Sequence, residues 1–351
     1  MIQTYSTTIR RKEMDAVLTC MVDEKIGPGE LNIRLIQQVK ETFKCDGAVA
    51  LRSPAIALNY VLKALDLEKG SKILLSALAP SWQYQVVEGL GYEPYVLDVE
   101  EATGLVNAKT YEEATKNGGK LIILHETEGI VPSDLNEILQ IGIPVIEDIS
   151  QSAGAVVNLK NETTGEVEQK RAGLFGLYTI LGLEERDVIT AGGGAVLMAP
   201  GRREWIVLKK FVDEAPVTDL LPDINCALGW VQVKEYARNE KTRKEFFAMY
   251  QQACMMGRHK MFAREGDDGS TMSCFPLILN TSFKDVKQYT ARKEIEIQPA
   301  FENSIIAYKD ELSSDCVHAK SIMLRCAHFP LYPRLTHNEV AKIVKVLGSL
   351  P

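Results

Sequence analysis

The chain has 351 residues, of which 46% are hydrophobic and 25% are charged, a balance typical of a soluble globular protein with room for a large and a smaller domain. Its formal net charge of -7 disfavours nucleic acid and anionic membrane surfaces as main partners. No apolar stretch reaches the ~20 residues that span a bilayer, and the first residues lack the apolar centre of a signal peptide, so we expect a cytoplasmic protein.

Short apolar runs alternate with helical patterns between residues 46 and 200. Runs bounded by glycine, proline or charge predict strands at 48–51, 72–75, 94–97, 121–124, 144–146, 177–181 and 195–198. Runs of this kind are typical of strands buried on both faces of a parallel sheet. Helical spacing at 56–65, directly after the first run, starts an alternation that implies βαβ crossovers.

The rest of the chain divides into an excursion, a helical stretch and a smaller unit. The polar segment 158–171 predicts an exposed hairpin, and helices are expected at 205–211 and 227–250. A smaller α+β unit follows, with strands expected at 274–279 and 296–298 and helices at 285–293, 317–325 and 338–347. We therefore predict a large domain over residues 1–240 and a small C-terminal domain over 241–351.

The cysteines and histidines predict neither a disulfide framework nor a metal site. The 7 cysteines are scattered, odd in number and never in a C-x-x-C pair, so reduced and mostly buried thiols are expected. No pair among the 5 histidines has the spacing of metal ligands.

The segment 145–154, VIEDISQSAG, is the most informative part of the chain. An apolar run ends in acids and is followed by a turn of small residues. This pattern places Asp148 at the C-terminal end of a buried strand, where open α/β sheets bind ligands. The alternative role for Asp148 is to cap the strand or to accept the amides of the turn.

Six blocks of this sequence, in the same order, resemble the DegT/DnrJ/StrS sugar aminotransferases. They are 48–65, 91–99, 145–155, 192–196, 221–229 (LPDINCALG) and 329–336 (FPLYPRLT). The resemblance implies the type I fold of transferases that depend on pyridoxal phosphate (PLP). That fold is a mostly parallel seven-stranded α/β sheet with helices on both faces and a small C-terminal α+β domain. The resemblance also implies a homodimer with sites at the subunit interface, and PLP as the cofactor.

The resemblance assigns cofactor contacts to Asp148, Gln151, Ser53 and Trp82. Asp148 matches the acid that keeps the pyridine nitrogen protonated, which makes the ring an electron sink. Gln151 matches the glutamine beside the ring hydroxyl, and Ser53 keeps a hydroxyl in the phosphate cup. Trp82 lies near the ring-stacking position, which a count without gaps gives to Pro80. The alternative role for Trp82 is packing between helix and sheet.

The lysine that forms the Schiff base in this family has no counterpart here. Counting forward from 172–176 puts its position at Asp187, and counting back from 193–196 puts it at Arg186. Neither residue can form an imine, because arginine stays protonated and a carboxylate has no amine. The resemblance therefore predicts a family member without its catalytic lysine.

Several of the hydrogen-bond donors that would hold the phosphate are missing as well. Pro54 has no N–H to donate, and Ala55 has no hydroxyl. Gly182 and Thr218 stand where the family has a serine and an asparagine. Each change removes a donor, so PLP is predicted to be absent or weakly bound.

Arg186 and His125 are the predicted substrate contacts, and three hypotheses stay open. Arg186 can pair with an anionic group as a fork. His125 lies at a strand end, and its alternative role is that of a polar loop residue.

The first hypothesis is a binding or regulatory protein of sugar or glycan metabolism that lacks the internal aldimine, with a sugar or nucleotide-sugar ligand and an active aminotransferase as a partner. The second is an active PLP-dependent nucleotide-sugar aminotransferase with a lysine from elsewhere. The third is a different reaction in the old cleft, using Arg186 with Glu184 and Glu185.

Overall fold

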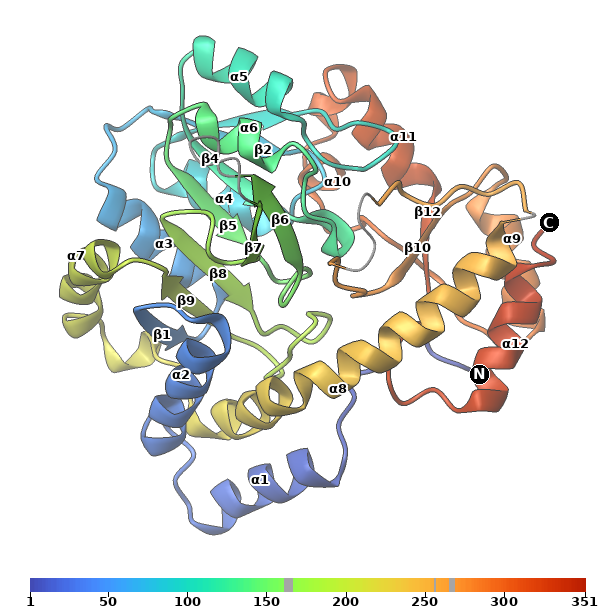
Figure 1. Ribbon diagram of the computed structural model, residues 1–351, viewed down its shortest axis with the longest axis horizontal. Coiled ribbons are helices and arrows are strands. Elements are labelled where there is room, and N and C mark those ends of the chain that lie inside the picture. Colours follow the sequence, from blue (N-terminus) through green and yellow to red (C-terminus); the bar gives the residue numbers. More distant parts are fainter. Residues whose placement is uncertain (161–166, 256, 265–268) are drawn as a thin grey trace.

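A seven-stranded sheet forms the centre of the computed structural model, which describes residues 1–160, 167–255, 257–264 and 269–351 (Figure 1). The strands are β1 (Gly47–Leu51), β2 (Lys72–Ser76), β3 (Glu93–Leu97), β4 (Gly119–His125), β5 (Val145–Asp148), β8 (Tyr178–Gly182) and β9 (Ala195–Ala199). Their order across the sheet is β1-β9-β8-β5-β4-β2-β3. The pairings of β9 with β1 and β8 are antiparallel, and the others are parallel. The predicted α/β fold with a mostly parallel sheet is therefore confirmed.

Helices cover both faces of this sheet. One face carries α3 (Pro54–Leu65), α4 (Ser81–Gly89) and α7 (Arg202–Asp213), and the other carries α2 (Glu30–Phe43), α5 (Ala108–Lys116), α6 (Leu135–Gln140) and the first part of α8 (Asp223–Cys254). In β2, Ile73 and Leu75 pack on the first face, whereas Leu74 packs on the second. Because both faces are buried, successive residues of a strand are all apolar, which is why short apolar runs identified these strands.

A second sheet, of three antiparallel strands, forms the core of the C-terminal part. Its strand order is β10 (Phe275–Ile278), β12 (Cys326–Phe329) and β11 (Gln298–Pro299). The helices of this part are α9 (Phe283–Arg292), α10 (Ile305–Tyr308), α11 (Val317–Arg325) and α12 (His337–Leu347). The sequence did not predict β12, the central strand, because it begins at the residue that follows α11 and no turn marks its start.

The predicted hairpin is confirmed by β6 (Val156–Lys160) and β7 (Val167–Arg171), which pair in antiparallel register. The predicted tip of this hairpin at 161–166 lies outside the described residues. The helix α1 (Arg11–Val22) and three short 3-10 turns complete the secondary structure of the described residues; the turns are η1 (Thr127–Gly129), η2 (Val217–Asp219) and η3 (Asp310–Ser314).

Two segments connect the large part of the molecule, which is built around the seven-stranded sheet, with the small part, which is built around the three-stranded sheet. The long helix α8 runs from beside the large sheet to the small one, so the predicted domain boundary at residue 240 falls inside a continuous helix (Figure 1). The first residues of the chain reach the small part, where Ile2 pairs with Ile295. The division into 1–240 and 241–351 therefore stays a prediction. Across the described ranges, no helix combines the length and the apolar character needed to cross a membrane.

Asp223, the first residue of α8, holds the start of α2. Its Oδ1 accepts hydrogen bonds from the N–H groups of Gly29 (2.8 Å) and Asn32 (2.9 Å), and its Oδ2 accepts one from that of Leu31 (3.0 Å). The side chain of Asn32 in turn donates to the carbonyl of Leu221 at 2.8 Å. A carboxylate at this position satisfies amides that have no partner within their own helix. The LPDIN block is thus explained by the junction of two helices.

Candidate functional site

The carboxylate of Asp148 is fully buried at the C-terminal end of β5 and accepts hydrogen bonds on both oxygens. Its Oδ2 lies 2.7 Å from Nε2 of Gln83 and 3.1 Å from Nδ1 of His125. Its Oδ1 accepts the N–H of Ser150 at 3.1 Å and also the hydroxyl of that residue. Burial alone would raise the pKa of this carboxyl. The hydrogen bond and the charge of His125, together with the hydrogen bonds of Ser150, hold that pKa below its ordinary value. Asp148 is therefore ionised and already partnered by its own chain.

Other acids are buried next to Asp148. Glu147 is fully buried and accepts three backbone N–H groups of the turn 173–176. Burial raises the pKa of Glu147 to about 7 in spite of these hydrogen bonds. Burial, together with the nearby Glu147 and Asp148, raises the pKa of Glu126 well above its ordinary range. The end of β5 is thus an acidic centre in which burial shifts the carboxyl groups of Glu126 and Glu147 toward their protonated forms.

The carboxyl group of Asp187 turns inward, toward this acidic centre. Its Oδ2 accepts the N–H of Glu184 at 2.7 Å. A Cβ at Gly182 would lie 2.4 Å from that oxygen and 2.5 Å from Oγ of Ser150, so the glycine leaves the space that Asp187 occupies. Burial, followed by repulsion from Asp148 and Glu184, raises the pKa of Asp187 to about 8.

Arg186, one residue earlier, turns outward and joins the two parts of the chain. Its Nη1 donates to Glu302 and its Nη2 to Gln298, both at 3.1 Å. Its guanidinium lies over the ring of Tyr5, 4.5 Å from the ring centre. The fork that was predicted to bind an anionic ligand is thus engaged by side chains of the small part of the molecule.

A cavity of about 260 Å³ lies above this centre, between the large and small parts. It is lined by Tyr5, Leu78, Pro80, Trp82, His125, Gln151, Glu184, Arg186, Asp187, Ser273, Cys274, Ala300, Phe301, Asn303, Ser304 and His328. Within the described part of the chain, no lysine lines it. The lysines nearest in sequence to Arg186 lie elsewhere: Lys170 pairs with Glu168 on β7, and Lys209 pairs with Asp213 on α7.

Most of the predicted site residues meet at this cavity. Those in its lining are Trp82, His125, Gln151, Arg186 and Asp187. Asp148 is covered by His125 and has no exposed surface, and Ser53 instead caps α3 by accepting the N–H of Ile56 at 3.2 Å. Trp82 both lines the cavity and packs against the core, so its two predicted roles are compatible.

Two features of the site differ from the sequence-based expectation. His125 is a buried strand residue that binds Asp148, so its interpretation as a polar loop residue was wrong. Gln83 was missed, although its fully buried side chain is a partner of Asp148. Its only sequence signal is a polar residue within the first turn of a helix that follows a buried strand.

We expect Asp187→Asn to change how stability depends on pH. The pKa of about 8 lies above the ordinary value of 3.8, so the folded state keeps a proton that the unfolded chain releases, and stability falls as pH rises through this window. The variant cannot titrate there. It should resemble the wild type below about pH 4 and exceed its free energy of unfolding by at least about 1 kcal/mol at about pH 9.

Urea unfolding across this pH range measures the difference between the two proteins. Glu147 titrates in the same range in both proteins, so its contribution cancels in the difference. Glu185→Gln, at an exposed neighbouring position, is the matched control and should leave the pH profile unchanged. A pH-independent difference between wild type and Asp187→Asn would contradict a buried proton at this position.

Solved structures share this fold over nearly the whole chain. A Streptococcus pneumoniae protein described as a sugar aminotransferase, in its PLP form, aligns with a TM-score of 0.83 at 17% identity and covers 97% of this chain and 96% of its own. The E. coli GDP-4-keto-6-deoxy-D-mannose-3-dehydratase with bound hydrated PLP aligns with a TM-score of 0.84 at 18% identity and covers 99% of both chains. A mutant GDP-4-keto-6-deoxymannose-3-dehydratase with bound GDP-perosamine gives the same two values, and the alignment covers 99% of this chain and 100% of that one.

These likenesses establish the type I fold of PLP-dependent transferases, as the sequence predicted. Residues 7–348 match the DegT/DnrJ/EryC1/StrS aminotransferase family. The match spans all six blocks of sequence that carried the resemblance. The chain therefore belongs to the DegT/DnrJ/EryC1/StrS aminotransferase family.

Proposed function

We propose that this chain binds a sugar or nucleotide sugar in its cavity and carries out no lysine-dependent transamination. The observation that carries this proposal is the inward-facing carboxyl group of Asp187, beside Asp148; Asp187 is one of the two residues, with Arg186, that counting along the sequence assigns to the lysine position of the family. A carboxyl group cannot form an imine with an aldehyde. The absence of lysine from the described cavity lining supports the same conclusion.

The residues present do not fit PLP. A protonated pyridine nitrogen needs a free acceptor, but both oxygens of Asp148 already accept hydrogen bonds from the chain's own donors. A phosphate dianion needs donors, but α3 begins with Pro54, which has no N–H, and Gly182 has no hydroxyl. These points support weak or absent PLP binding.

The chemistry of the cavity suits a sugar. Three aromatic side chains, Tyr5, Trp82 and Phe301, face a set of amide and hydroxyl groups, and sugar rings offer both an apolar face and many hydroxyls. The volume of about 260 Å³ is below the ~300–1,000 Å³ of sites that enclose drug-sized ligands. We therefore infer that a single sugar unit enters the cavity and that an attached nucleotide would lie outside it. The neighbour with bound GDP-perosamine supports this choice of ligand class.

A second candidate function is a proton-transfer reaction on the bound sugar. It is favoured by one observation: Asp187 keeps its proton near neutral pH, while the neighbouring Asp148 is ionised. Acids whose pKa values are pushed apart are typical of acid–base catalysis. In this case Asp187, which lines the cavity, would be the donor. Product analysis after incubation with nucleotide sugars separates this candidate from pure binding.

A homodimer is part of this proposal, and an apolar stripe on α1 (Arg11–Val22) indicates where it forms. Met14, Leu18 and Met21 follow one face of this helix and are 50%, 56% and 53% exposed. Helix α1 packs on α8, next to the segment 221–229 that resembles a helix start near the partner subunit. An exposed apolar face of this kind is typical of a protein interface. An active family member that presents a similar face would pair through the same surface.

We expect PLP titration to give no aldimine absorbance band. Borohydride reduction followed by peptide mapping should find no saturable lysine adduct, because the cavity lining offers no amine. Asp187→Lys places an amine in the cavity, so this variant tests whether the remaining residues can hold PLP. It should also stay colourless, because Asp148 is already partnered and the phosphate donors are lacking. A saturable adduct in the wild type would restore the aminotransferase hypothesis, and a coloured Asp187→Lys protein would show that the site still fits PLP.

We expect a nucleotide sugar to bind in calorimetry and Trp82→Ala to weaken that binding at least about tenfold, because loss of an aromatic contact costs over 1 kcal/mol. Trp230→Ala is the matched control, since Trp230 lies on α8 outside the cavity lining. The free nucleoside diphosphate should bind more weakly than the nucleotide sugar. Equal effects of the two tryptophan substitutions would contradict a sugar site in this cavity.

We expect Leu18→Glu to convert the dimer to monomer, because a charge placed within an apolar interface must be desolvated. Sedimentation velocity at micromolar concentration measures the change. Leu324→Glu is the matched control, because Leu324 is similarly exposed (61%, against 56% for Leu18) but lies on α11 in the small part. A wild-type protein that sediments only as monomer, or a dimer that Leu18→Glu leaves intact, would contradict this interface.

A further inference from the structure

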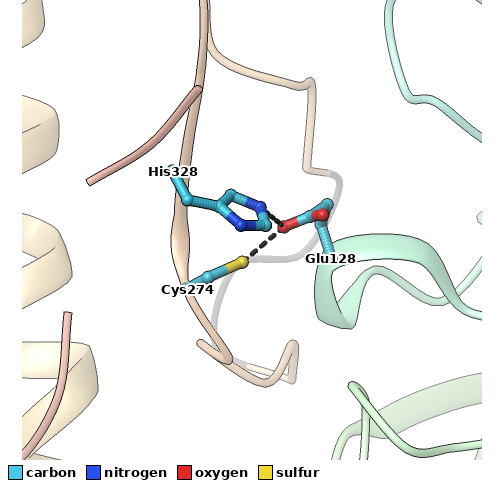
Figure 2. A group of neighbouring side chains, drawn as sticks. All are labelled: Glu128, Cys274 and His328. Atoms are coloured by element: carbon cyan, nitrogen blue, oxygen red, sulfur yellow. Dashed lines mark hydrogen bonds and ion pairs between the residues drawn. The ribbon is translucent and has the colours of Figure 1, made fainter. Parts of the chain in front are cut away.

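Three side chains of different chemistry meet beside the cavity, and two of them, Cys274 and His328, belong to its lining (Figure 2). The ligand atoms of Glu128, Cys274 and His328 all lie within 4.8 Å of one another. Nε2 of His328 is 2.8 Å from Oε2 of Glu128, and the thiol of Cys274 donates to the same oxygen. The other carboxylate oxygen, Oε1 of Glu128, is buried and has no hydrogen-bond partner among the described residues. Glu128 therefore has unused capacity to bind a cation here.

The fold brings these residues together from three separate segments. In the small sheet, Phe275 pairs with Phe329 and Pro276 pairs with His328 in antiparallel register, so Cys274, which directly precedes β10, lies diagonally across from His328 on the same face. Glu128 comes from the large part of the molecule, in the turn η1 after β4. Figure 2 shows the imidazole and the thiol both directed at one carboxylate oxygen of Glu128. A ligand held by all three residues would join the two parts of the chain.

The backbone at Glu128 is held in an unusual conformation that places its side chain. Its φ of 58° and ψ of 25° lie in the left-handed region, which is unfavourable for a residue with a Cβ. The N–H of Glu128 donates to Oε1 of Gln151 at 2.6 Å, and its carbonyl accepts Nη2 of Arg264 at 2.7 Å. Strain that is held by several partners is typical of functional sites.

We propose that Glu128, Cys274 and His328 bind one zinc ion, with a fourth coordination position facing the cavity. Thiolate, imidazole and carboxylate are the protein ligands of zinc, and three of them with one open position form the pattern of reactive zinc sites. Bonds of about 2.0–2.3 Å in a tetrahedron separate ligand atoms by roughly 3.3–3.8 Å, so the present spacing needs only small adjustments. Cys274 and His328 line the cavity, so a hydroxyl or carbonyl oxygen of a cavity ligand could fill the open position.

The second ring nitrogen of His328 is also fixed. Its Nδ1 lies 2.7 Å from the hydroxyl of Tyr5, which leaves Nε2 directed at the cluster. A partner on the far nitrogen of a histidine sets its tautomer and its orientation as a metal ligand. Tyr5 is held in turn under the guanidinium of Arg186. Tyr5 is therefore a positioning residue of the zinc site.

Zinc binding has a defined proton balance. The thiol of Cys274 must lose its proton to become a thiolate, and Nε2 of His328 must be free of a proton to bind the ion, so zinc binding releases protons to solvent and becomes weaker as the pH falls. A reactive cysteine is the competing interpretation of the cluster. It is disfavoured because Nε2 of His328 is directed at the carboxylate, and the sulfur itself donates to that carboxylate.

The test uses the full chain, freed of metal with a chelator and titrated with Zn²⁺ alone and with Co²⁺ alone. We expect one ion per chain and, with Co²⁺, a thiolate-to-cobalt charge-transfer band. Cys274→Ser should abolish that band and weaken Zn²⁺ binding by about 100-fold or more, and Tyr5→Phe should keep the band while weakening binding about tenfold. Cys316→Ser is the matched control, since Cys316 is a buried free cysteine of the small part that lies outside the cluster.

Each outcome of this test decides the proposal. Circular dichroism of each variant shows whether it has folded, and Glu128→Gln, which keeps the shape of the side chain, provides a second ligand deletion if Cys274→Ser is unstable. A folded wild type without the sulfur band, or a Cys274→Ser protein that binds zinc as the wild type does, would overturn the proposal. No sugar or PLP is present in these titrations, so the result is independent of the function proposed above.

Discussion

The buried carboxylate of Asp148 is the constraint on which the centre of this molecule depends. An ionised group without solvent must be fully hydrogen-bonded, and a single missing partner would cost several kcal/mol. Its donors come from α4, from the end of β4 and from the turn after β5, so these three elements are fixed relative to one another. The same hydrogen bonds use the oxygens that a pyridine ring would need. This shared demand on the oxygens of Asp148 is one reason for our proposal that PLP binds weakly or not at all.

The cavity lies between two parts of the molecule that also contact each other directly beside it, where Pro80 pairs with Ser304 and the N–H of Ile305 donates to the carbonyl of Ala79. Arg186 reaches from the large part to Glu302 and Gln298, and Glu128 reaches across to His328. Arg186 and Glu302 form a salt bridge, His328 is hydrogen-bonded to Glu128, and both links border the space in which we place the ligand. A ligand that enters this space contacts residues of both parts at once. Binding is therefore expected to stabilise one relative placement of the large and small parts.

Much of the fold could be predicted because its signals are local. Strands buried on both faces are short apolar runs, and the acid at the end of one such run placed Asp148 correctly at the end of β5. The site was harder to predict, because its geometry depends on contacts between distant segments. The spacing rules for metal ligands consider residues near each other in sequence, whereas Glu128, Cys274 and His328 come from three separate elements. The strand β12, which carries His328, was itself not predicted, because no turn precedes it.

The contact between Gly182 and Asp187 has a consequence for any attempt to engineer phosphate binding into this chain. A serine at position 182 would place its Cβ 2.4 Å from Oδ2 of Asp187 and 2.5 Å from Oγ of Ser150, so both side chains would have to move. A side chain at position 182 and the acid at position 187 therefore compete for the same space, and substitutions at the two positions are expected to be non-additive. A new hydroxyl on β8 would be accommodated best together with a smaller residue at position 187.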